Sequence, residues 1–409
     1  MKPITAVVLG AGSRGSTYAG FAKAFPEELQ IVAIAEPRAD RRNLLAEELN
    51  IPKSHRFASW QELLAQPKMA DCAFVCTMDD DHTAPAIRAM ELGYHILLEK
   101  PMSNTEEECH MIADTASRTG RSLAVCHVLR YTPFYMTLKN LIDQGQIGQV
   151  VAINQIENVG YWHQAHSFVR GNWRTVRETS PMILQKSCHD MDIILWLMGK
   201  DCRRVQSFGS LRHFTPEHAP AGAPARCLDG CPHADSCPYY APALYLDMNL
   251  TGWPVDVITT DLSEAGRRKA LEEGPYGRCV YHCDNDVVDR QVVNLEFDGG
   301  AVATFTMTAF SADFSRQLKI FGTVGQITAD MGTGQIVLHR FGEEKRTIPL
   351  DMGAGRSGHG GGDYGIMRDF LHILRDGGES RTSASISLQS HLICFAAERS
   401  RKEHIVVEL

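Results

Sequence analysis

The hydrophobic and polar positions of the chain change their pattern about one third of the way along. Up to about residue 125, short apolar runs alternate with segments of helical periodicity. Apolar strands that are separated by helices indicate a buried parallel sheet with right-handed crossovers. The pattern predicts strands at Thr5–Leu9, Leu29–Ala35, Asp71–Thr77 and Tyr94–Glu99, with helices up to Phe25 and over Arg38–Leu49 and Pro85–Leu92.

From about residue 150 the apolar residues alternate with polar ones, as in half-buried strands. Asp298-Gly299-Gly300 is a hairpin signal between two of these runs. The pattern predicts a large, mostly antiparallel sheet with helices on one face and the other face free for a partner subunit. The predicted strands are Val150–Val159, Val205–Arg212, Val292–Phe297, Ala301–Thr308, Arg316–Phe321, Gln335–Arg340 and Ile405–Glu408, and the predicted helices are Tyr364–Arg375 and about Ile386–Arg401.

Composition narrows the class of protein. The 409 residues carry a net charge of -8, which argues against a nucleic-acid or anionic-membrane partner. No apolar run has membrane-spanning length, and the N-terminus shows no signal-peptide pattern. We therefore expect a cytoplasmic protein in which the 12 cysteines are reduced.

The first apolar run leads into Gly10-Ala11-Gly12-Ser13-Arg14-Gly15, which fits the dinucleotide fingerprint G-x-G-x-x-G. The glycines allow a tight turn, close approach of a pyrophosphate and close packing of the helix on the strand. Glu36 follows 21 residues after Gly15, where a carboxylate would bind the ribose 2'-hydroxyl and repel a 2'-phosphate. NAD is thus favoured over NADP, although Arg38 lies nearby. The predicted cofactor-binding residues of this segment are Gly10, Gly12, Ser13, Arg14, Gly15, Glu36 and Arg38.

These patterns predict an α/β fold with an N-terminal Rossmann domain at 1–125 and a C-terminal α+β domain at 126–409. A cysteine-rich insert interrupts the second domain at about 212–288. The last strand of the Rossmann part ends in Glu99-Lys100-Pro101, which places a lysine between a carboxylate and a proline. Lys100 is our first candidate for an acid/base, because a cationic nicotinamide and apolar walls would depress its pKa.

The glycine turn followed by Glu99-Lys100-Pro101 resembles the Gfo/Idh/MocA family of oxidoreductases, and the similarity covers the whole chain apart from the insert. Thr77-Met78-Asp79-Asp80-Asp81-His82 is similar to the family's T-P-x-x-x-H loop, with methionine in place of proline. The resemblance implies that Thr77, His82 and Glu99 lie at the nicotinamide and that Lys100 reaches the substrate hydroxyl. It also implies a homo-oligomer, a dimer or tetramer, paired through the C-terminal sheet.

The segment Gln185-Lys186-Ser187-Cys188-His189-Asp190-Met191-Asp192 aligns with the family's D-x-G-x-H-x-x-D stretch. The resemblance makes His189 the proton-transfer partner of Lys100 and puts Asp192 at the second aspartate. Gln185 stands where inositol-type members have an aspartate, so it cannot relay a proton. Lys186 adds a third candidate for the acid/base group, and an inositol-like substrate is placed in doubt.

A second polar segment runs from Gly160 to Arg174, and its lack of periodicity predicts a loop. Aromatic faces stack on sugar rings, while histidine and arginine bind hydroxyls or anions. We expect a hydroxylated substrate with a carboxylate, phosphate or sulfonate, or else arginines in structural ion pairs. The candidate substrate-binding residues are Arg130, Tyr131, Trp162, His163, His166, Arg170, Trp173, Arg174 and Asp192.

The insert holds five cysteines whose loop-like context suits a structural Zn²⁺ site, with free buried thiols as the alternative. Four thiolates would close the metal's coordination shell and leave no position for a catalytic water. The predicted ligands are Cys227, Cys231, Cys237 and Cys283, with Cys279 as the alternative fourth ligand.

Two enzymatic functions fit this sequence. The first is an NAD-dependent dehydrogenase that oxidises a ring CH–OH of a sugar with Lys100 and His189 as acid and base. The second is implied by the resemblance, since some relatives of this fold are NAD-dependent glycoside hydrolases. Such an enzyme oxidises C3, eliminates the aglycone, adds water and re-reduces the ring, and one such group acts on anionic glycosides, the sulfoquinovosides. A dinucleotide sensor without turnover is the non-enzymatic reading.

Overall fold

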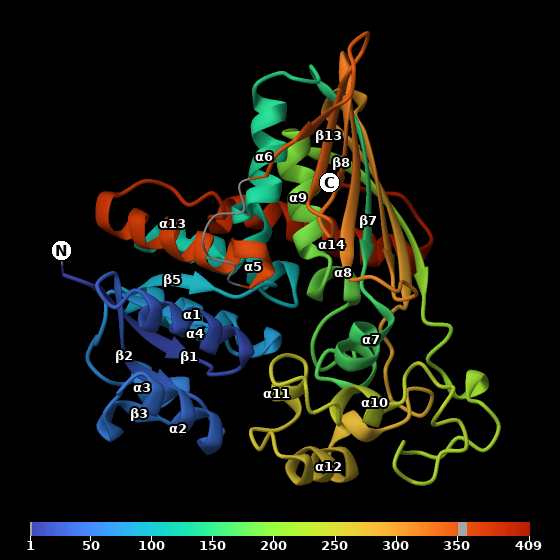
Figure 1. Cartoon of the computed structure of the whole chain (residues 1–409). Helices are drawn as coiled ribbons and strands as arrows, with labels where there is room; N and C mark the ends of the chain where they lie inside the picture. The colour runs from blue at the N-terminus through green and yellow to red at the C-terminus, as the bar shows by residue number, and fades with distance from the viewer. Residues whose placement is uncertain (1, 351–357) are drawn as a thin grey trace.

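Two β-sheets organise the chain in a computed structural model that describes residues 2–350 and 358–409. One sheet lies with the N-terminal third of the chain and the other with the C-terminal half (Figure 1). The insert, drawn in yellow-green, lies beyond one end of the second sheet (Figure 1). Among the described residues no helix is both long and apolar enough to cross a membrane.

The first sheet is a Rossmann sheet of six parallel strands in the order β3-β2-β1-β4-β5-β6. The predicted parallel sheet is confirmed, and β1 lies between β2 and β4, where the strand order reverses. Ligands of open α/β sheets bind at this switch point, outside the carboxyl ends of the strands. The strands are β1 (Ile4–Leu9), β2 (Leu29–Ala35), β3 (Arg56–Phe57), β4 (Cys72–Val75), β5 (His95–Leu98) and β6 (Leu123–Val125), and the helices are α1 (Ser13–Ala24), α2 (Ala39–Glu48), α3 (Trp60–Leu64), α4 (Thr83–Glu91) and α5 (Glu106–Thr119).

The second sheet has nine strands in the order β14-β13-β12-β11-β7-β10-β9-β8-β15. All its pairs are antiparallel except β7 with β10, so the predicted mostly antiparallel sheet is confirmed. Strands β12 and β14 are additions to the predicted set. The strands are β7 (Val150–Asn158), β8 (Cys202–Ser210), β9 (Arg290–Phe297), β10 (Val302–Thr308), β11 (Ser315–Gly322), β12 (Gly325–Asp330), β13 (Gln335–Arg340), β14 (Arg346–Ile348) and β15 (Val407–Glu408).

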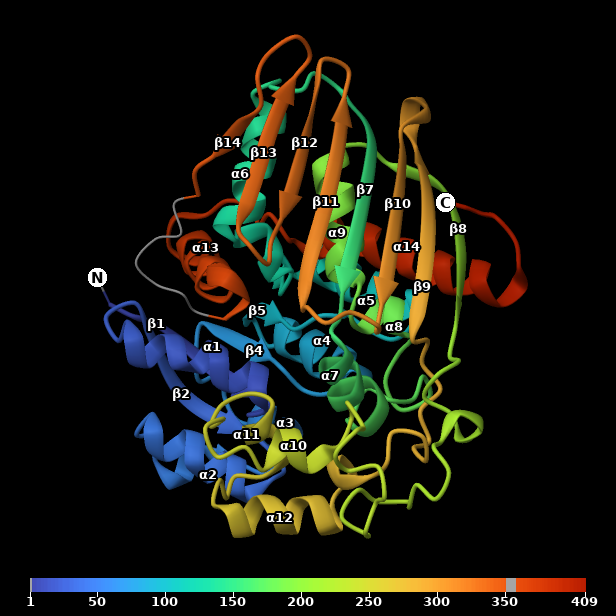
Figure 2. The ribbon, with the colours of Figure 1, turned by 45° about the vertical axis from the view of Figure 1, so that its right-hand side comes forward.

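Helices cover only one face of this second sheet. Helices α6 (Pro133–Asp143), α9 (Cys188–Met198) and α14 (Ala384–Glu403) lie behind it, and the other face is open to the viewer (Figure 2). The covered face supplies buried Ile153, Val293 and Phe305 to the core. The open face carries exposed Ile156 and Val302.

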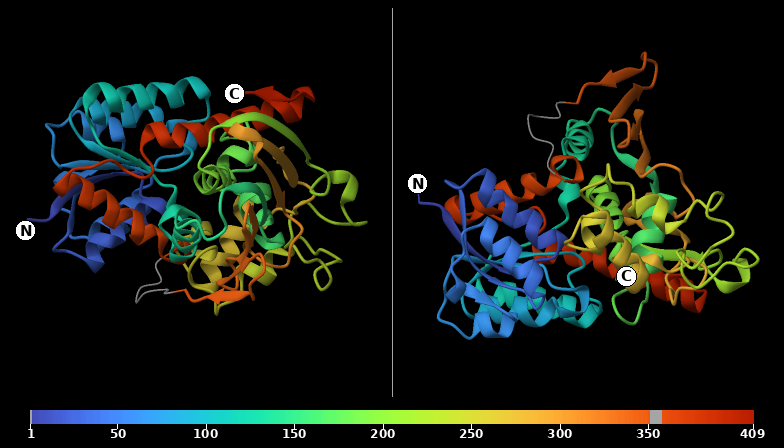
Figure 3. Two further views of the ribbon diagram at one scale, coloured as in Figure 1. Left: turned by 90° about the horizontal axis from the view of Figure 1, so that it is seen from above. Right: turned by 60° about the horizontal axis from the view of Figure 1, so that its bottom comes forward.

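The end of the chain returns to the Rossmann sheet. Helix α13 (Gly362–Asp376) packs Ile366, Met367 and Phe370 into the same core as β1 and α1. Both C-terminal helices, drawn in red, lie against the blue and cyan elements when seen from above (Figure 3). The predicted boundary at residue 125 stays a prediction, but the Rossmann core is completed by residues from the far end of the sequence.

Two regions that sequence patterns left irregular contain helices. The segment after β7 forms α7 (Tyr161–His163) and a wide π-helical turn over Gln164–Arg170, so the prediction of a loop there is wrong. Its residues 163–170 are all buried, which hides the amphipathic periodicity that a surface helix would show. The remaining short helices are α8 (Met182–Gln185) and, in the insert, α10 (Ala241–Tyr245), α11 (Val255–Ile258) and α12 (Glu264–Glu273).

Candidate active site

The glycine turn has the backbone geometry of a dinucleotide site. Gly10 has a φ of +96°, and a Cβ on it would lie 2.3 Å from the Cys76 carbonyl oxygen. A Cβ on Gly15 would lie 1.9 Å from the Gly10 oxygen. A Cβ on Gly12 would instead enter open space, with the Arg41 guanidinium 3.9 Å away. No side chain caps the first turn of α1, so its N–H groups are available to a phosphate. These features fit a bound dinucleotide.

Glu36 is fixed at the end of β2 beside this turn. Its carboxylate accepts the Ala11 N–H at 2.8 Å and the Arg38 N–H at 2.9 Å. The Arg38 guanidinium turns outward and pairs with Asp40 at 2.7 Å. The contacts place a carboxylate, with no arginine paired to it through side chains, where the ribose of a dinucleotide would lie.

Arg14 links three parts of the fold. Its guanidinium donates to Glu99 at 2.8 Å and to Asp363 of α13 at 2.6 Å. Glu99 also accepts the Tyr18 hydroxyl at 2.7 Å and the Lys100 N–H at 2.9 Å. Burial alone would raise the pKa of Glu99, but the charges of Arg14 and Lys100 lower it below the usual range. Glu99 is therefore an anion next to the predicted nicotinamide position, and the Arg14 side chain is held by protein carboxylates.

The loop after β4 is held in place by its own residues. The His82 ring bonds to the carbonyls of Pro101 at 2.7 Å and Thr77 at 3.2 Å, and the Thr77 hydroxyl donates to the Asp81 carbonyl. Asp79, which the sequence reading did not single out, is buried beside them. Burial raises the pKa of Asp79, against the opposing charges of His82 and Lys100.

Lys100 follows β5, and its Nζ donates to the main-chain carbonyl oxygen of Gln185 at 2.5 Å. This carbonyl belongs to the last residue of α8. The family's aspartate is absent at position 185, but the contact that orients Lys100 does not use the side chain there. The lysine is thus held between the end of the Rossmann sheet and the segment that carries His189.

His189 is buried in the first turn of α9, and its Nδ1 has no hydrogen-bond partner among the described residues. Its ring lies 5.8 Å from that of His127 and 6.2 Å from that of His359, between ring centroids. Burial, with the charge of Lys100, lowers the pKa of His189 well below its usual value. The imidazole is therefore neutral at pH 7, and its Nδ1 is open to a hydrogen bond from a ligand.

Three of the predicted substrate ligands are bonded to other groups of the protein. Arg130 and Asp192 form a buried bidentate pair at 2.6 and 2.7 Å. The Tyr131 hydroxyl donates to Asp369 at 2.9 Å. These groups position α9 and α13 in this structure, and a contact with substrate remains a prediction.

Lys186 belongs to a buried network of four charges that the sequence reading did not assemble. Arg316 of β11 binds Glu157 at 2.6 Å and Asp190 at 2.8 Å, and Lys186 Nζ lies 3.5 Å from Glu157. Burial lowers the pKa of Lys186 to about 8, and Glu157 limits that decrease. Burial raises the pKa of Asp190, although Arg316 opposes the shift. The pKa of Lys186 is therefore close to the neutral range in which a side chain can both give and take a proton.

Comparison with known proteins agrees with this geometry. The sequence profile described as "Oxidoreductase family, NAD-binding Rossmann fold" matches residues 4–127, and the profile of the same family's C-terminal alpha/beta domain matches residues 139–409. The chain belongs to the Gfo/Idh/MocA family of oxidoreductases. The resemblance drawn from the motifs is confirmed.

Individual relatives of this Gfo/Idh/MocA protein are distant. YteT of Bacillus subtilis (strain 168), named as an oxidoreductase, is 25% identical over 317 residues, which cover 74% of this chain and 72% of YteT. The 2,7-anhydro-N-acetylneuraminate hydratase of Mediterraneibacter gnavus is 26% identical over 199 residues, covering 49% of this chain and 50% of the hydratase. A levoglucosan dehydrogenase solved with NADH and levoglucosan has a TM-score of 0.73 at 17% identity, with 100% of this chain and 99% of that chain covered. The last likeness shows the fold.

In this family member, the arginines of segment 160–174 attach the insert, and other side chains of the segment lie near Lys186. Arg170 is buried and donates to the carbonyls of Arg278 at 2.7 Å and Tyr239 at 2.6 Å, and Arg174 pairs with Asp284 at 2.9 Å. Both arginines thereby attach the insert: Arg174 through a structural ion pair, as the alternative expects, and Arg170 through hydrogen bonds to main-chain carbonyls. Trp162 and His163, near Lys186, contact each other instead of the insert's main chain, and their rings stack with centroids 5.7 Å apart.

The other two predicted substrate residues of this segment also contact protein groups. His166 Nδ1 lies 2.8 Å from the Tyr245 hydroxyl, and its ring stacks on Tyr276 at 4.9 Å. The Trp173 indole N–H donates to Asp79 at 3.4 Å. Trp173 therefore connects the segment to the loop after β4, and His166 connects it to the insert.

The cysteines of the insert gather at one place. Four of them line a cavity of about 20 Å³ together with Arg170, whose Nη2 lies 3.8 Å from the Cys227 Sγ. Cys283 does not line it, and its thiol donates to the Cys279 carbonyl at 3.2 Å. Within residues 2–350 and 358–409, no group of three or more His, Cys, Asp or Glu side chains is already arranged as a metal site. The four cysteines at the cavity are Cys227, Cys231, Cys237 and Cys279.

Proposed function

We propose that this protein oxidises a secondary hydroxyl on the ring of a carbohydrate with NAD, and that Lys100 exchanges the hydroxyl proton. The observation that carries the proposal is the position of Lys100. Its ammonium is held by the Gln185 carbonyl just beyond the carboxyl end of β5, near neutral His189, and only β4 separates β5 from the strand that leads into the glycine turn. Bound NAD would supply the hydride acceptor.

The residues divide the proton transfer between them. Lys100 can take the hydroxyl proton only as a neutral amine, so its ammonium must first give up a proton, and the Nδ1 of buried His189, which has no partner among the described residues, is a nearby nitrogen for it. Lys186, whose Nζ lies 3.5 Å from Glu157, adds a second acid/base group, with a pKa of about 8. A positioned acid or base with a pKa near the working pH typically contributes 10²- to 10⁴-fold to such a step.

Support for a carbohydrate comes from what the relatives are named for. They include the levoglucosan dehydrogenase, the anhydro-sialic acid hydratase and an inositol 2-dehydrogenase of Saccharopolyspora erythraea, which is 29% identical over 133 residues covering 36% of its length. An anionic substrate is less well supported, because Arg130, Arg170 and Arg174 are engaged with protein groups.

A redox-neutral glycoside hydrolase is our second candidate. A ketone at C3 acidifies the C2 proton, so that a base removes it and the aglycone leaves with its oxygen. Water then adds at C1, and hydride returns to C3, so no net oxidant is consumed. The observation that favours it is the presence of a second base beyond Lys100, since the pKa of Lys186 is lowered to about 8 and the charges of the two lysines influence each other.

A screen that follows NADH and released aglycone together tests both candidates. Free sugars, methyl glycosides and 4-nitrophenyl glycosides, neutral and anionic, are incubated with the enzyme and NAD. A dehydrogenase accumulates NADH in proportion to product, whereas a hydrolase releases nitrophenol with no net NADH. Lys100→Ala should lower turnover about 10²- to 10⁴-fold and leave the NAD dissociation constant unchanged. Full activity in that variant would contradict the proposal.

We further propose that Cys227, Cys231, Cys237 and Cys279 hold a structural Zn²⁺. The cavity they line has room for about one water-sized ion, and the four sulfur-bearing side chains meet at it from separate parts of the insert. The contact of Cys283 with a carbonyl supports Cys279 as the fourth ligand. Protein purified without chelator should contain one zinc per chain, Cys279→Ser should lose it and Cys283→Ser should keep it. Metal-free protein would refute the site.

We also propose that two chains pair through the open face of the nine-stranded sheet. Ile156 and Val302 are 40% and 46% exposed on neighbouring strands of that face, where a partner would bury them. Light scattering should show a dimer or tetramer for the native chain and a smaller species for Ile156→Lys. A native monomer would contradict the proposal.

A further inference from the structure

The insert contributes an exposed aromatic ring beside the catalytic segment. Trp253, just before α11, is 42% exposed, although tryptophan usually buries most of its area. Its ring centroid lies 4.9 Å from that of His163, 5.2 Å from that of Trp162 and 5.5 Å from that of His166. One side of this ring is thus held by the 160–174 segment, while a large part of its surface remains open.

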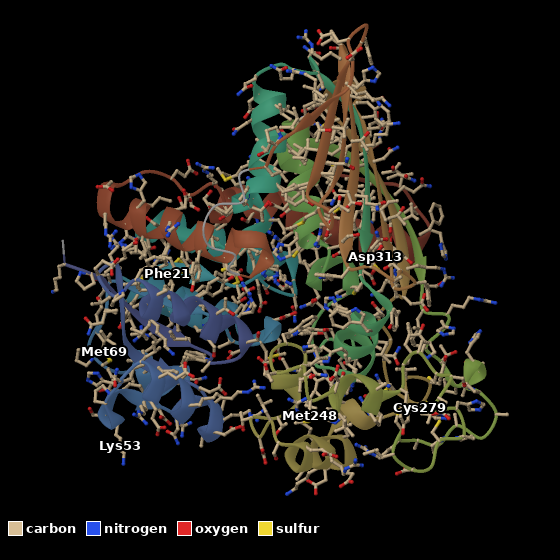
Figure 4. The ribbon with its side chains drawn as sticks, viewed as in Figure 1. Phe21, Lys53, Met69, Met248, Cys279 and Asp313 are labelled. Atoms are coloured by element: carbon tan, nitrogen blue, oxygen red, sulfur yellow. The ribbon has the colours of Figure 1, made fainter. Side chains whose placement is uncertain are left out.

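A second exposed ring reaches the same place from the sheet. Phe314, between β10 and β11, is 45% exposed and lies 5.1 Å from the His163 ring. Its neighbour Asp313 lies at the end of the sheet nearest the insert, whose Met248 and Cys279 are also labelled (Figure 4). His163 itself is 7% exposed and has an Nδ1 without a partner among the described residues. Two partly exposed aromatic rings therefore flank one buried imidazole, whose Nδ1 has no partner among the described residues.

This arrangement adjoins the acid/base residues. Lys186 Nζ lies 4.9 Å from the centre of the Phe314 ring. The preceding residue, Gln185, holds Lys100 Nζ through its carbonyl. The aromatic rings are therefore one side chain away from the residues that contact the oxidised ring in the proposed function.

We propose that Trp253 and Phe314 form a second ring-binding subsite, with His163 as its polar contact, which holds the sugar attached through the glycosidic oxygen to the ring that is oxidised. The proposal rests on the proposed function and narrows its substrate to a glycoside. The C–H faces of a pyranose pack on aromatic rings, and an imidazole Nδ1 can bond to one of its hydroxyls. A free monosaccharide bound at the acid/base residues would leave both exposed rings and the buried His163 Nδ1 without a contact to the substrate.

The test compares one-ring and two-ring substrates in matched variants. The one-ring substrates are glucose and its methyl glycosides, and the two-ring substrates are cellobiose, maltose and the 4-nitrophenyl glucosides. A second set replaces glucose by galactose in each compound. For every substrate, kcat and KM are measured separately with the native protein and with each variant. For two-ring substrates Trp253→Ala should raise KM about tenfold, and Phe314→Leu should raise it less. Both variants should keep the native kcat/KM for one-ring substrates. Phe341→Ala removes an aromatic that is 62% exposed in the turn after β13, and it should change neither parameter.

Each outcome decides between the alternatives. A loss confined to disaccharides assigns a sugar to the subsite, and a loss confined to nitrophenyl glycosides overturns the sugar in favour of an aryl aglycone. Equal losses for one-ring and two-ring substrates, or none, would show that Trp253 only supports the insert and would overturn the subsite. If the native protein neither binds nor turns over any sugar, and Lys100→Ala behaves in the same way, the proposed function itself fails.

Discussion

Replacing Gly12 with alanine should abolish tight NAD binding without unfolding the protein. Gly12 has a φ of -70° and a ψ of -170°, which alanine adopts without strain. Its Cβ would contact only the Arg41 guanidinium, at 3.9 Å. Because Gly12 caps α1, we expect a loss of about 1 kcal/mol or less in the free energy of unfolding.

The same methyl group would occupy the space that a pyrophosphate needs above the turn. If the displaced phosphate loses one charged hydrogen bond to the backbone, the cost is about 1.5–3 kcal/mol. That cost corresponds to a dissociation constant about 10- to 150-fold higher. Gly10→Ala would differ, because its Cβ would lie 2.3 Å from the Cys76 oxygen at a φ of +96° and should destabilise the fold itself.

Isothermal titration with NAD and thermal melting of the NAD-free protein separate these effects. Gly20→Ala is the matched control, since it lies in the same helix with nothing within 4 Å of its Cβ. It should raise the melting temperature slightly and leave the NAD affinity unchanged, because alanine is favoured over glycine inside a helix. A folded Gly12→Ala protein with native NAD affinity would refute the placement of the pyrophosphate over this turn.

Three further predictions follow from contacts within the site. Gln185→Met should keep most of the activity, because Lys100 bonds to the main chain at 185; a loss as large as that of Lys100→Ala would show that the amide is needed. Arg130→Met should lower the free energy of unfolding by about 3–5 kcal/mol in urea titrations, since it leaves Asp192 charged and buried, whereas exposed Arg177→Met should have almost no effect. Burial lowers the pKa of His127 to about 4, against about 6.5 when unfolded, so the unfolded chain binds the proton first and stability falls by up to about 1.4 kcal/mol per pH unit from pH 6.5 to 4. His127→Leu should flatten that slope, and an unchanged slope would contradict a neutral His127.

Local pattern was sufficient for much of the fold. Apolar runs of strand length, separated by helical periodicity, predicted the parallel sheet because burial on both faces leaves a continuous hydrophobic signal. Alternation predicted the antiparallel sheet for the complementary reason, that one face meets solvent. β12 escaped prediction because Gly325 and Asp330 at its ends resemble turn residues.

The sequence by itself determined the parts of the site that depend on residue type at short spacing. Gly10 and Gly15 are needed because any side chain would collide with neighbouring backbone. Lys100 is placed by sequence as well, since it lies two residues after the end of β5. Such constraints act within a few residues or between adjacent strands, so they leave a motif.

Only the tertiary structure decided how these parts are held. Arg14 meets Asp363 across 349 residues, and Arg316 meets Glu157 across 159. Lys100 is oriented by a main-chain carbonyl, which every residue possesses and no motif records. Trp253 comes to His163 through the folding of the insert. Contacts of these kinds depend on chain segments meeting in space, and their energies come from burial and charge pairing that exist only after the segments have packed.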